Sequence, residues 1–200
     1  MPDAFLFDIG RVLVQFDFGL AFSRLAPLAA ADITAAEADI RSWLTPLETG
    51  ALTTAAFIAR SVDILGGDVT PAAFEEAYCD IFTRHAPMEN AVASLVENYP
   101  LYLFSNTSEL HERRLLRDYR VFRHFRGGIF SWRAGAMKPD DAIYEQAIAL
   151  TGCRPERIGY IDDLPANVAT GQRRGLITHH YDAAAHGEFE FWLGSLVASA

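Results

Sequence analysis

The stretch FLFDIGRVLV (residues 5–14) decides the fold and raises a question about one of its own residues. Together with Ala4, its first three residues form an apolar run, which is typical of a strand buried on both faces of a parallel sheet. Asp8 ends that run, and Ile9 and Gly10 follow it. A carboxylate at the end of a buried strand needs a chemical or structural reason.

Four further apolar segments of strand length follow, and helix-like or turn-rich segments separate them. The five expected strands cover residues 4–9, 101–105, 128–131, 157–161 and 176–181. This alternation predicts an α/β fold: a Rossmann-like, doubly wound parallel sheet with helices on both faces. We expect residues 1–17 and 86–200 to form this core.

Residues 18–85 interrupt the alternation. They show helical periodicity, as at Phe57, Ile58 and Val62, and no convincing strand. The segment therefore predicts a helical cap inserted after the first strand, with Trp43 and Phe57 more typical of the cap core than of a substrate-binding surface.

Charge and composition exclude several classes of protein. The 200 residues include 17 Lys and Arg against 26 Asp and Glu, a net charge of −9, which argues against nonspecific binding to nucleic acid or to an anionic membrane. The N-terminus lacks the pattern of a signal peptide, and no apolar stretch is long enough to span a bilayer. We expect a cytoplasmic monomer or homodimer. The two cysteines, Cys79 and Cys153, form no zinc-binding pattern.

Polar residues follow the expected strands at the edge where open parallel sheets bind ligands. They are Asp8 after the first strand, Ser105 and Asn106 at the second, Lys138 before a proline-started helix, and Asp162 and Asp163 at the fourth. Each group alone is typical of a turn or helix cap. Their occurrence in order favours a site, because clustered carboxylates repel one another unless they hold a cation such as Mg²⁺. A hydroxyl and a lysine beside them suit a phosphate group.

Four motifs together resemble the haloacid dehalogenase superfamily of hydrolases: FLFDIGRVLV, LYLFSNTS, GAMKPDDAIYEQAI and IGYIDDLPANV. The inserted segment is similar to the small helical cap of some members, and ETGALTTAAF (residues 48–57) resembles a part of such caps. Within the superfamily the sequence is most similar to bacterial sugar-phosphate phosphatases of the glucose-1-phosphate phosphatase type.

The resemblance implies a Mg²⁺-dependent phosphatase that hydrolyses a small phosphorylated metabolite, such as a sugar phosphate, through an aspartyl-phosphate. Asp8 would be the nucleophile, and Gly10 would allow a sharp turn that aims its carbonyl at the metal. The implied metal ligands are Asp8, the Gly10 carbonyl, Asp162 and Asp163. The implied phosphate-binding residues are Ser105, Asn106 and Lys138, and Asn167 would orient Asp163 or a bound water. For Arg11, next to the expected nucleophile turn, two alternatives stay open: contact with the substrate anion, or an ordinary ion pair.

One position departs from the pattern. Most phosphatases of the superfamily carry an aspartate two residues after the nucleophile as general acid and base, and here that residue is Gly10. Its loss should slow hydrolysis of alkyl esters more than of esters with good leaving groups. Two alternatives stay open: a metal-independent 2-haloacid dehalogenase, and a non-catalytic binding or regulatory protein on the same scaffold.

Overall fold

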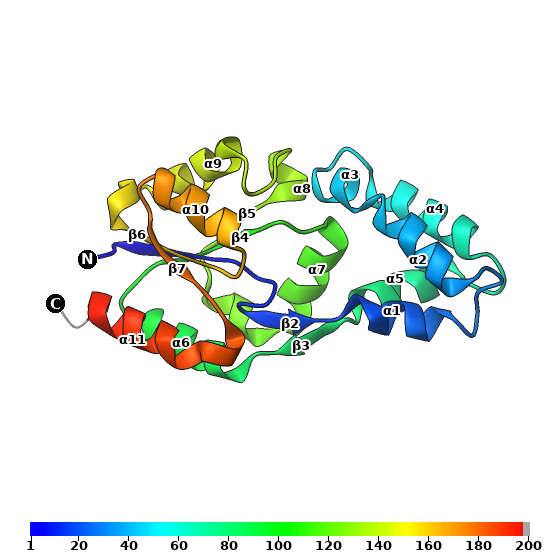
Figure 1. Ribbon diagram of the computed structural model, residues 1–200, viewed down its shortest axis with the longest axis horizontal. Helices are drawn as coiled ribbons and strands as arrows, with labels where there is room; N and C mark the ends of the chain where they lie inside the picture. Colours follow the sequence, from blue (N-terminus) through cyan, green and yellow to red (C-terminus); the bar gives the residue numbers. More distant parts are fainter. Residues whose placement is uncertain (198–200) are drawn as a thin grey trace.

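A five-stranded parallel sheet forms the centre of the computed structural model, which describes residues 1–197 (Figure 1). The strand order is β5-β4-β1-β6-β7. The strands are β1 (Ala4–Phe7), β4 (Leu101–Ser105), β5 (Gly128–Phe130), β6 (Ile158–Asp162) and β7 (Ile177–His180). All five expected strands are present with bounds within two residues of those predicted, so the predicted α/β fold is confirmed.

Helices cover both faces of the sheet because successive side chains of a strand point to opposite faces. Phe5 and Phe7 pack with residues of α6, α7 and α11, and Leu6 packs with residues of α9. The helices outside the insertion are α6 (Ala86–Leu95), α7 (Glu109–Asp118), α8 (Ser131–Ala134), α9 (Asp141–Thr151), α10 (Pro165–Arg173) and α11 (His186–Val197), with short 3₁₀ turns at Arg120–His124, Pro155–Arg157 and Ala183–Ala185.

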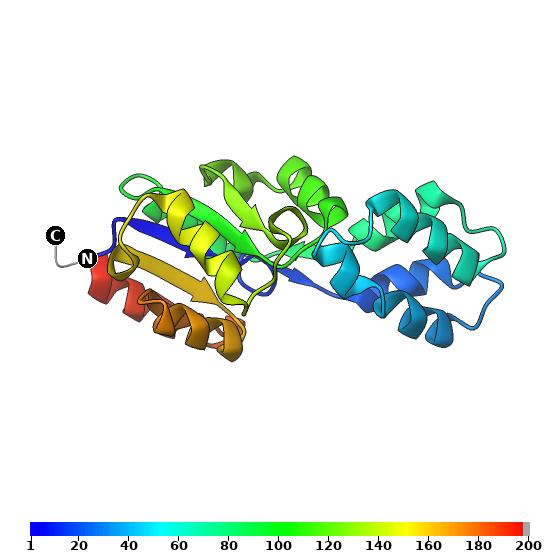
Figure 2. The same ribbon diagram turned by 90° about the horizontal axis from the view of Figure 1, so that it is seen from above.

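Residues 18–79 fold into five helices with a hydrophobic cluster of their own, in which Phe57 and Phe74 are fully buried. The helices are α1 (Phe18–Leu25), α2 (Ile33–Arg41), α3 (Leu44–Glu48), α4 (Thr54–Leu65) and α5 (Pro71–Cys79). Figure 2 shows these helices at one end of an elongated molecule, beyond the sheet.

The expectation that no strand lies within residues 18–85 is wrong. The antiparallel strands β2 (Val14–Phe16) and β3 (Phe82–Arg84) form a two-stranded ribbon where the chain enters and leaves the helical segment. Each strand has three residues, too few for period-2 alternation to stand out in the sequence. Their pairing depends on a contact between segments that lie far apart in the chain.

Side chains of α5 and α7 join the helical segment to the sheet-containing part. His111 stacks on Tyr78 with ring centroids 4.6 Å apart, and a ring nitrogen lies 3.1 Å from the Tyr78 carbonyl oxygen. Arg114 forms an ion pair with Glu76 at the same junction. Within residues 1–197, no helix has both the length and the apolar character needed to cross a membrane.

Gly159 lies opposite Phe5 in the β1–β6 register, and a Cβ at this position would overlap the Phe5 ring. We predict that Gly159→Ala lowers the free energy of unfolding by about 1–3 kcal/mol, because the buried ring has no space to move. Gly187→Ala is the control, since Gly187 is in α11 with open space around it and the change should be neutral or slightly stabilising. Equal urea midpoints for the two variants would contradict the packing argument.

Burial lowers the pKa of His111 to about 4, although its hydrogen bond to the Tyr78 carbonyl acts in the opposite direction. The unfolded chain therefore binds a proton between pH ~6.5 and pH ~4 that the folded protein does not bind, so stability falls as the pH falls through this window. We expect this one group to account for about 3 kcal/mol of that loss. Urea unfolding should show a weaker pH dependence for His111→Phe, whereas the exposed control His124→Gln should keep the wild-type slope.

Candidate active site

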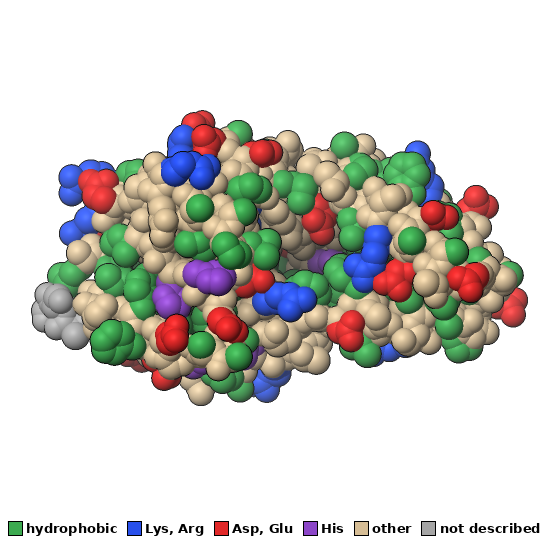
Figure 3. Space-filling view, in the orientation of Figure 1, with side chains coloured by type: hydrophobic (Ala, Val, Ile, Leu, Met, Phe, Trp, Pro, Cys, Tyr) green, Lys and Arg blue, Asp and Glu red, His purple; other side chains and the backbone are tan. Residues whose placement is uncertain are grey.

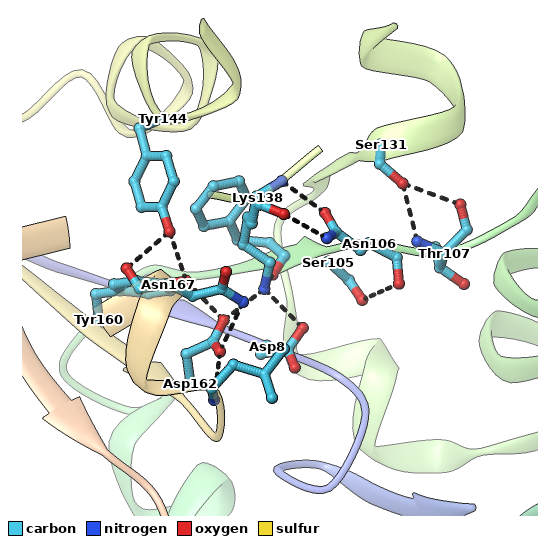
Figure 4. Close-up of polar contacts among 12 residues, drawn as sticks. Asp8, Ser105, Asn106, Thr107, Ser131, Lys138, Tyr144, Tyr160, Asp162 and Asn167 are labelled. Atoms are coloured by element: carbon cyan, nitrogen blue, oxygen red, sulfur yellow. Dashed lines mark hydrogen bonds and ion pairs between the residues drawn. The ribbon is translucent and has the colours of Figure 1, made fainter. Parts of the chain in front are cut away.

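Asp8, Lys138 and Asp162 meet at the carboxyl edge of the sheet (Figure 4). Because Phe7 pairs with Ile161 in the parallel register, the residues that follow them, Asp8 and Asp162, lie side by side. The Asp8 amide donates to the Ile161 carbonyl at 2.9 Å and fixes this alignment beyond the end of β1. The strand pairing therefore brings two carboxylates together that are more than 150 positions apart in the chain.

The ammonium group of Lys138 lies between these carboxylates. Its Nζ donates to Asp8 Oδ1 at 2.8 Å, to Asp162 Oδ2 at 2.6 Å and to the Phe104 carbonyl oxygen at 2.7 Å. These contacts use all three of its N–H donors. Burial by itself would lower the pKa of Lys138, but the charges of Asp162 and Asp8 outweigh it and raise that pKa. The amine therefore stays protonated and neutralises part of the acidic cluster.

Asp162 is held more firmly than the sequence indicates. Besides Lys138, its Oδ2 accepts from the Tyr160 hydroxyl at 2.6 Å, and its Oδ1 accepts from the Leu164 amide and Asn167 Nδ2, each at 2.9 Å. The expectation that Asn167 orients Asp163 is not what the structure shows, because its amide donates to Asp162. Asn167 is the third residue of α10. From this first turn of the helix, its side chain reaches back to the end of the preceding strand.

The three carboxyl groups have different proton affinities. Burial raises the pKa of Asp8 to about 7 despite the opposing charge of Lys138, and the charges of Asp162 and Asp163 add to the rise. Burial also raises the pKa of the half-buried Asp163, and the neighbouring Asp162 contributes. For Asp162, burial acts in the same direction, but Lys138 and the hydrogen bonds to this carboxylate outweigh it and lower the pKa. The ionised forms of Asp8 and Asp163 are therefore disfavoured, and a bound cation would stabilise them.

The donor set fits a hard divalent cation. Asp8, Asp162 and Asp163 each present a carboxylate oxygen, and these oxygens all lie within 4.8 Å of one another. Oxygen ligands of this kind suit Mg²⁺. Since both oxygens of Asp162 already accept hydrogen bonds, Asp8 and Asp163 are the carboxylates better placed to ligate a metal directly.

Asn106 has a different contact from the expected one. Its side chain forms two hydrogen bonds with the backbone of Lys138: Nδ2 donates to the Lys138 carbonyl and Oδ1 accepts from the Lys138 amide, both at 2.8 Å. This amide therefore holds the loop that carries Lys138, and its donor is not directed at a ligand. Among the residues that the structure describes, the Ser105 hydroxyl by contrast makes only a long 3.4 Å contact with the Asn106 carbonyl oxygen. Its buried hydroxyl is available to a ligand.

The segment after Lys138 corrects a second expectation, since Pro139 does not start a helix. α9 begins at Asp141 after the N-cap Asp140, and Pro139 is in the preceding turn. The favourable first-turn position of proline is thus not used here. Lys138 is positioned by Asn106 and by its own ion pairs instead of by a helix start.

The left-handed residue of the turn after Asp8 is Arg11, and not Gly10. Arg11 has φ 58°, whereas the φ of Gly10 is outside the left-handed region. Arg11 donates its amide to the Val14 carbonyl at 2.7 Å, which closes the turn. Position 10 favours glycine for a different reason: a Cβ there would lie 2.9 Å from Cε1 of the Phe16 ring. Space, and not backbone conformation, restricts position 10.

Arg11 and Asp163 line the same cavity. Both line an open cavity of about 220 Å³ with Gln15, His180 and Tyr181. The guanidinium of Arg11 also lies over the Phe16 ring, 5.2 Å from its centroid. His180 places Nε2 2.9 Å from the Asp163 carbonyl oxygen. Arg11 therefore lines a cavity with Asp163, and its expected contact with a phosphate stays a prediction.

A second cavity, of about 70 Å³, lies between the sheet edge and the helical segment. Gly10, Ser105 and Asn106 line it from the sheet side, and Glu48 and His111 line it from α3 and α7. In Figure 3 the surface is hollowed between the two parts of the molecule, and acidic and histidine side chains lie in the hollow. Sequence reasoning missed Glu48 and His111 because neither follows a strand end; the segment ETGALTTAAF was the one signal near Glu48.

Comparison with known proteins is consistent with this geometry. The sequence profile described as haloacid dehalogenase-like hydrolase matches residues 2–175. Comparison with the curated proteins gives no match. Among solved structures, a predicted hydrolase of this type from Porphyromonas gingivalis has 27% sequence identity and a TM-score of 0.79, covering 96% of this chain and 98% of that one.

Two further solved structures have the same fold. An enzyme of the family from Bacteroides thetaiotaomicron, in a magnesium complex, has 22% identity and a TM-score of 0.82, covering 95% of this chain and 98% of that one. A 2-haloacid dehalogenase from Pseudomonas syringae has 15% identity and a TM-score of 0.67, covering 98% and 100%. Because the family profile spans most of the sequence, and because the strand order and the acidic cluster agree with it, this chain belongs to the haloacid dehalogenase-like hydrolases.

Proposed function

We propose that the protein is a Mg²⁺-dependent phosphatase that hydrolyses a small phosphorylated metabolite, with a sugar phosphate as the expected class of substrate. The observation that carries the proposal is the cluster of Asp8, Asp163, Asp162 and Lys138 at the carboxyl edge of the sheet. Three carboxylates against one lysine leave a net negative charge. A bound divalent cation would offset that charge and make the site attractive to a phosphate dianion.

In this proposal Asp8 is the nucleophile. One Asp8 oxygen accepts a hydrogen bond from Lys138, whose charge favours the ionised carboxylate and orients it. The other oxygen attacks phosphorus to form an aspartyl-phosphate, while the bond from phosphorus to the leaving oxygen breaks and the alcohol departs. The buried Ser105 hydroxyl binds a phosphate oxygen, and the positive charge of Lys138, whose three N–H donors are engaged, offsets part of the negative charge of Asp8 and the phosphate. Water then hydrolyses the acyl-phosphate and restores Asp8.

Mg²⁺, when bound, would supply positive charge next to the transferring phosphoryl group. We assign Asp8, the Gly10 carbonyl and Asp163 as its protein ligands. Asp162 stands beside them and holds Lys138 and Asn167 in place. The family member from Bacteroides thetaiotaomicron has been solved in complex with magnesium and inorganic phosphate, which supports the choice of both ligands.

We also propose that residues 18–85 act as a cap over the site. Their helices pack on their own cluster, and α3 and α5 contact the sheet-containing part next to the small cavity. That cavity admits only a small ligand unless the cap moves. The expected substrate is therefore a small metabolite and not a macromolecule.

A 2-haloacid dehalogenase is the second candidate, and two observations favour it. Position 10 has no acid, and the fold is shared with a dehalogenase from Pseudomonas syringae. The acidic cluster favours the phosphatase, because a metal-independent displacement of halide has no use for three carboxylates around one site. A non-catalytic role is the third candidate, and turnover of any phosphate ester would exclude it.

Substitution of the nucleophile tests the chemistry. We expect Asp8→Asn to abolish turnover of p-nitrophenyl phosphate while circular dichroism stays native, because the amide is isosteric but is a poor nucleophile. The control Asp17→Asn, at the exposed N-cap of α1, keeps a good capping side chain and should keep activity. Asp8→Asn activity at a tenth of wild type would exclude Asp8 as the nucleophile.

Removal of a metal ligand tests the cofactor. We expect Asp163→Ala to raise the Mg²⁺ concentration needed for half-maximal turnover by about tenfold or more, since one of few charged ligands is lost. Asp182→Asn is the matched control, because Asp182 lines the same cavity but is outside the acidic cluster. Turnover of p-nitrophenyl phosphate that persists in EDTA would contradict the metal dependence. Release of halide from a 2-haloacid in EDTA would favour the dehalogenase.

A further inference from the structure

The carboxyl group of Glu48 lies in the same cavity as the proposed catalytic strand ends. Glu48 is the last residue of α3, and Gly10, Ser105 and Asn106 line the cavity with it. Position 10 is the place where a superfamily phosphatase usually carries its general acid. The core lacks that carboxyl group, and the helical segment brings one to the same cavity.

The loop after Glu48 is docked on the sheet-containing part, so the position of this carboxyl group is fixed. Gly50 has φ 72° and lies against the Trp132 carbonyl on α8 so closely that a Cβ would overlap it. Four residues later, Thr54 Oγ1 donates to Glu109 Oε2 at 2.6 Å. Figure 1 shows α3 next to α8. Two contacts on either side of one short loop thus hold Glu48 over the cavity.

The surroundings of Glu48 leave its charge uncompensated. Burial raises the pKa of Glu48 to about 7, and within residues 1–197 no lysine or arginine opposes that shift. The polar groups that face this region are Tyr78 on α5, His111 on α7 and Arg41 on α2. Arg41 lies over the Phe18 ring, and burial keeps His111 neutral at pH 7.

The charge of Glu48 also acts on Tyr78. Burial raises the pKa of Tyr78 well above its ordinary value, and Glu48 adds to the rise. The Tyr78 hydroxyl is buried and has no hydrogen-bond partner in the described part of the chain, so it does not hold the Glu48 carboxyl group. A buried carboxyl group on a residue that lines the same cavity as Ser105 is suited to exchange protons with a ligand there.

We propose that Glu48 is the general acid and base of this phosphatase and replaces the aspartate absent at position 10. The inference rests on the proposed function. In the first step Asp8 forms a bond to phosphorus, the bond from phosphorus to the leaving oxygen breaks, and the Glu48 carboxyl gives its proton to that oxygen. In the second step the Glu48 carboxylate takes a proton from water while the water oxygen bonds to phosphorus, the Asp8–phosphorus link breaks, and inorganic phosphate leaves.

This role changes an expectation from the sequence. Without an acid at position 10, alkyl phosphates should be poor substrates. With Glu48 as the acid, the wild-type enzyme hydrolyses alkyl phosphates, and the rate falls as the pH rises through the pKa of Glu48 because the protonated form is lost. A leaving group that is stable as an anion does not need this proton.

The test compares two probes that differ in leaving group, ethyl phosphate and p-nitrophenyl phosphate, with Mg²⁺ present and release of the alcohol followed in a single turnover. We expect Glu48→Gln to lower the rate on ethyl phosphate by ~10²–10⁴-fold and to change the rate on p-nitrophenyl phosphate only a few-fold. The alkaline fall in rate should be absent from the variant. Asp63→Asn, which alters an exposed carboxyl group on α4, should match wild type on both probes.

Each other outcome has a defined meaning. Equal losses on both probes with native circular dichroism, or no loss on either, would overturn the role of Glu48. Wild-type cleavage of p-nitrophenyl phosphate without cleavage of ethyl phosphate would overturn it as well and leave the proposed function standing. Failure of wild type to cleave either probe overturns the proposed function, and the role of Glu48 falls with it.

A readout without turnover completes the test. Titration of ¹³C-labelled glutamate carboxyl groups by NMR, with the signal assigned by its loss in Glu48→Gln, should give a pKa far above that of an exposed glutamate. An ordinary pKa would overturn the proposal. If Glu48→Gln does not fold, Glu48→Asp replaces it in the kinetic comparison. This variant keeps a carboxyl group but shortens the side chain by one methylene. We expect it to lower the rate on ethyl phosphate and to leave the rate on p-nitrophenyl phosphate nearly unchanged.

Discussion

The three hydrogen bonds of the Lys138 ammonium group are the constraint on which the site depends. They join Asp8 after β1, Asp162 at the end of β6 and the Phe104 carbonyl of β4, so one buried cation links three neighbouring strands. Loss of one partner of a buried ion pair costs about 3–5 kcal/mol in proteins, because the remaining charge is uncompensated. The same contacts that orient Asp8, the proposed nucleophile, therefore also stabilise the sheet edge.

Neighbouring polar side chains hold Lys138 and its partner Asp162 in place by hydrogen bonds. Asn106 holds the backbone of Lys138, and Tyr160 and Asn167 hold Asp162. Within residues 1–197, the side chain of Asp163 has no comparable set of hydrogen bonds, and it lines a cavity with Arg11. One acidic residue of the pair is thus committed to structure and its neighbour is available to a ligand, although the two are adjacent in sequence and identical in type.

The helical segment contributes to the site through its position and not through its own core. A two-stranded ribbon carries the chain out and back, and stacking of His111 on Tyr78 fixes one contact with the sheet-containing part. A second contact needs a glycine at position 50, because the backbone approaches Trp132 closely. These contacts place Glu48 beside residues of the core from which it is separated by more than 35 positions in the chain.

The sequence by itself determined the five strands, the two-faced packing of the sheet, and the residues that stand at the strand ends, because burial and the period of side-chain direction are local properties of the chain. It could not assign Asn106 and Asn167 to their partners, detect the ribbon, or bring Glu48 to the cavity. Those features depend on contacts between distant segments. Hydrogen-bond partners and the burial of a lone carboxyl group exist only once the strands are in register and the helical segment is packed against the sheet-containing part. Tertiary structure therefore decided which of the acids are structural and which can take part in chemistry.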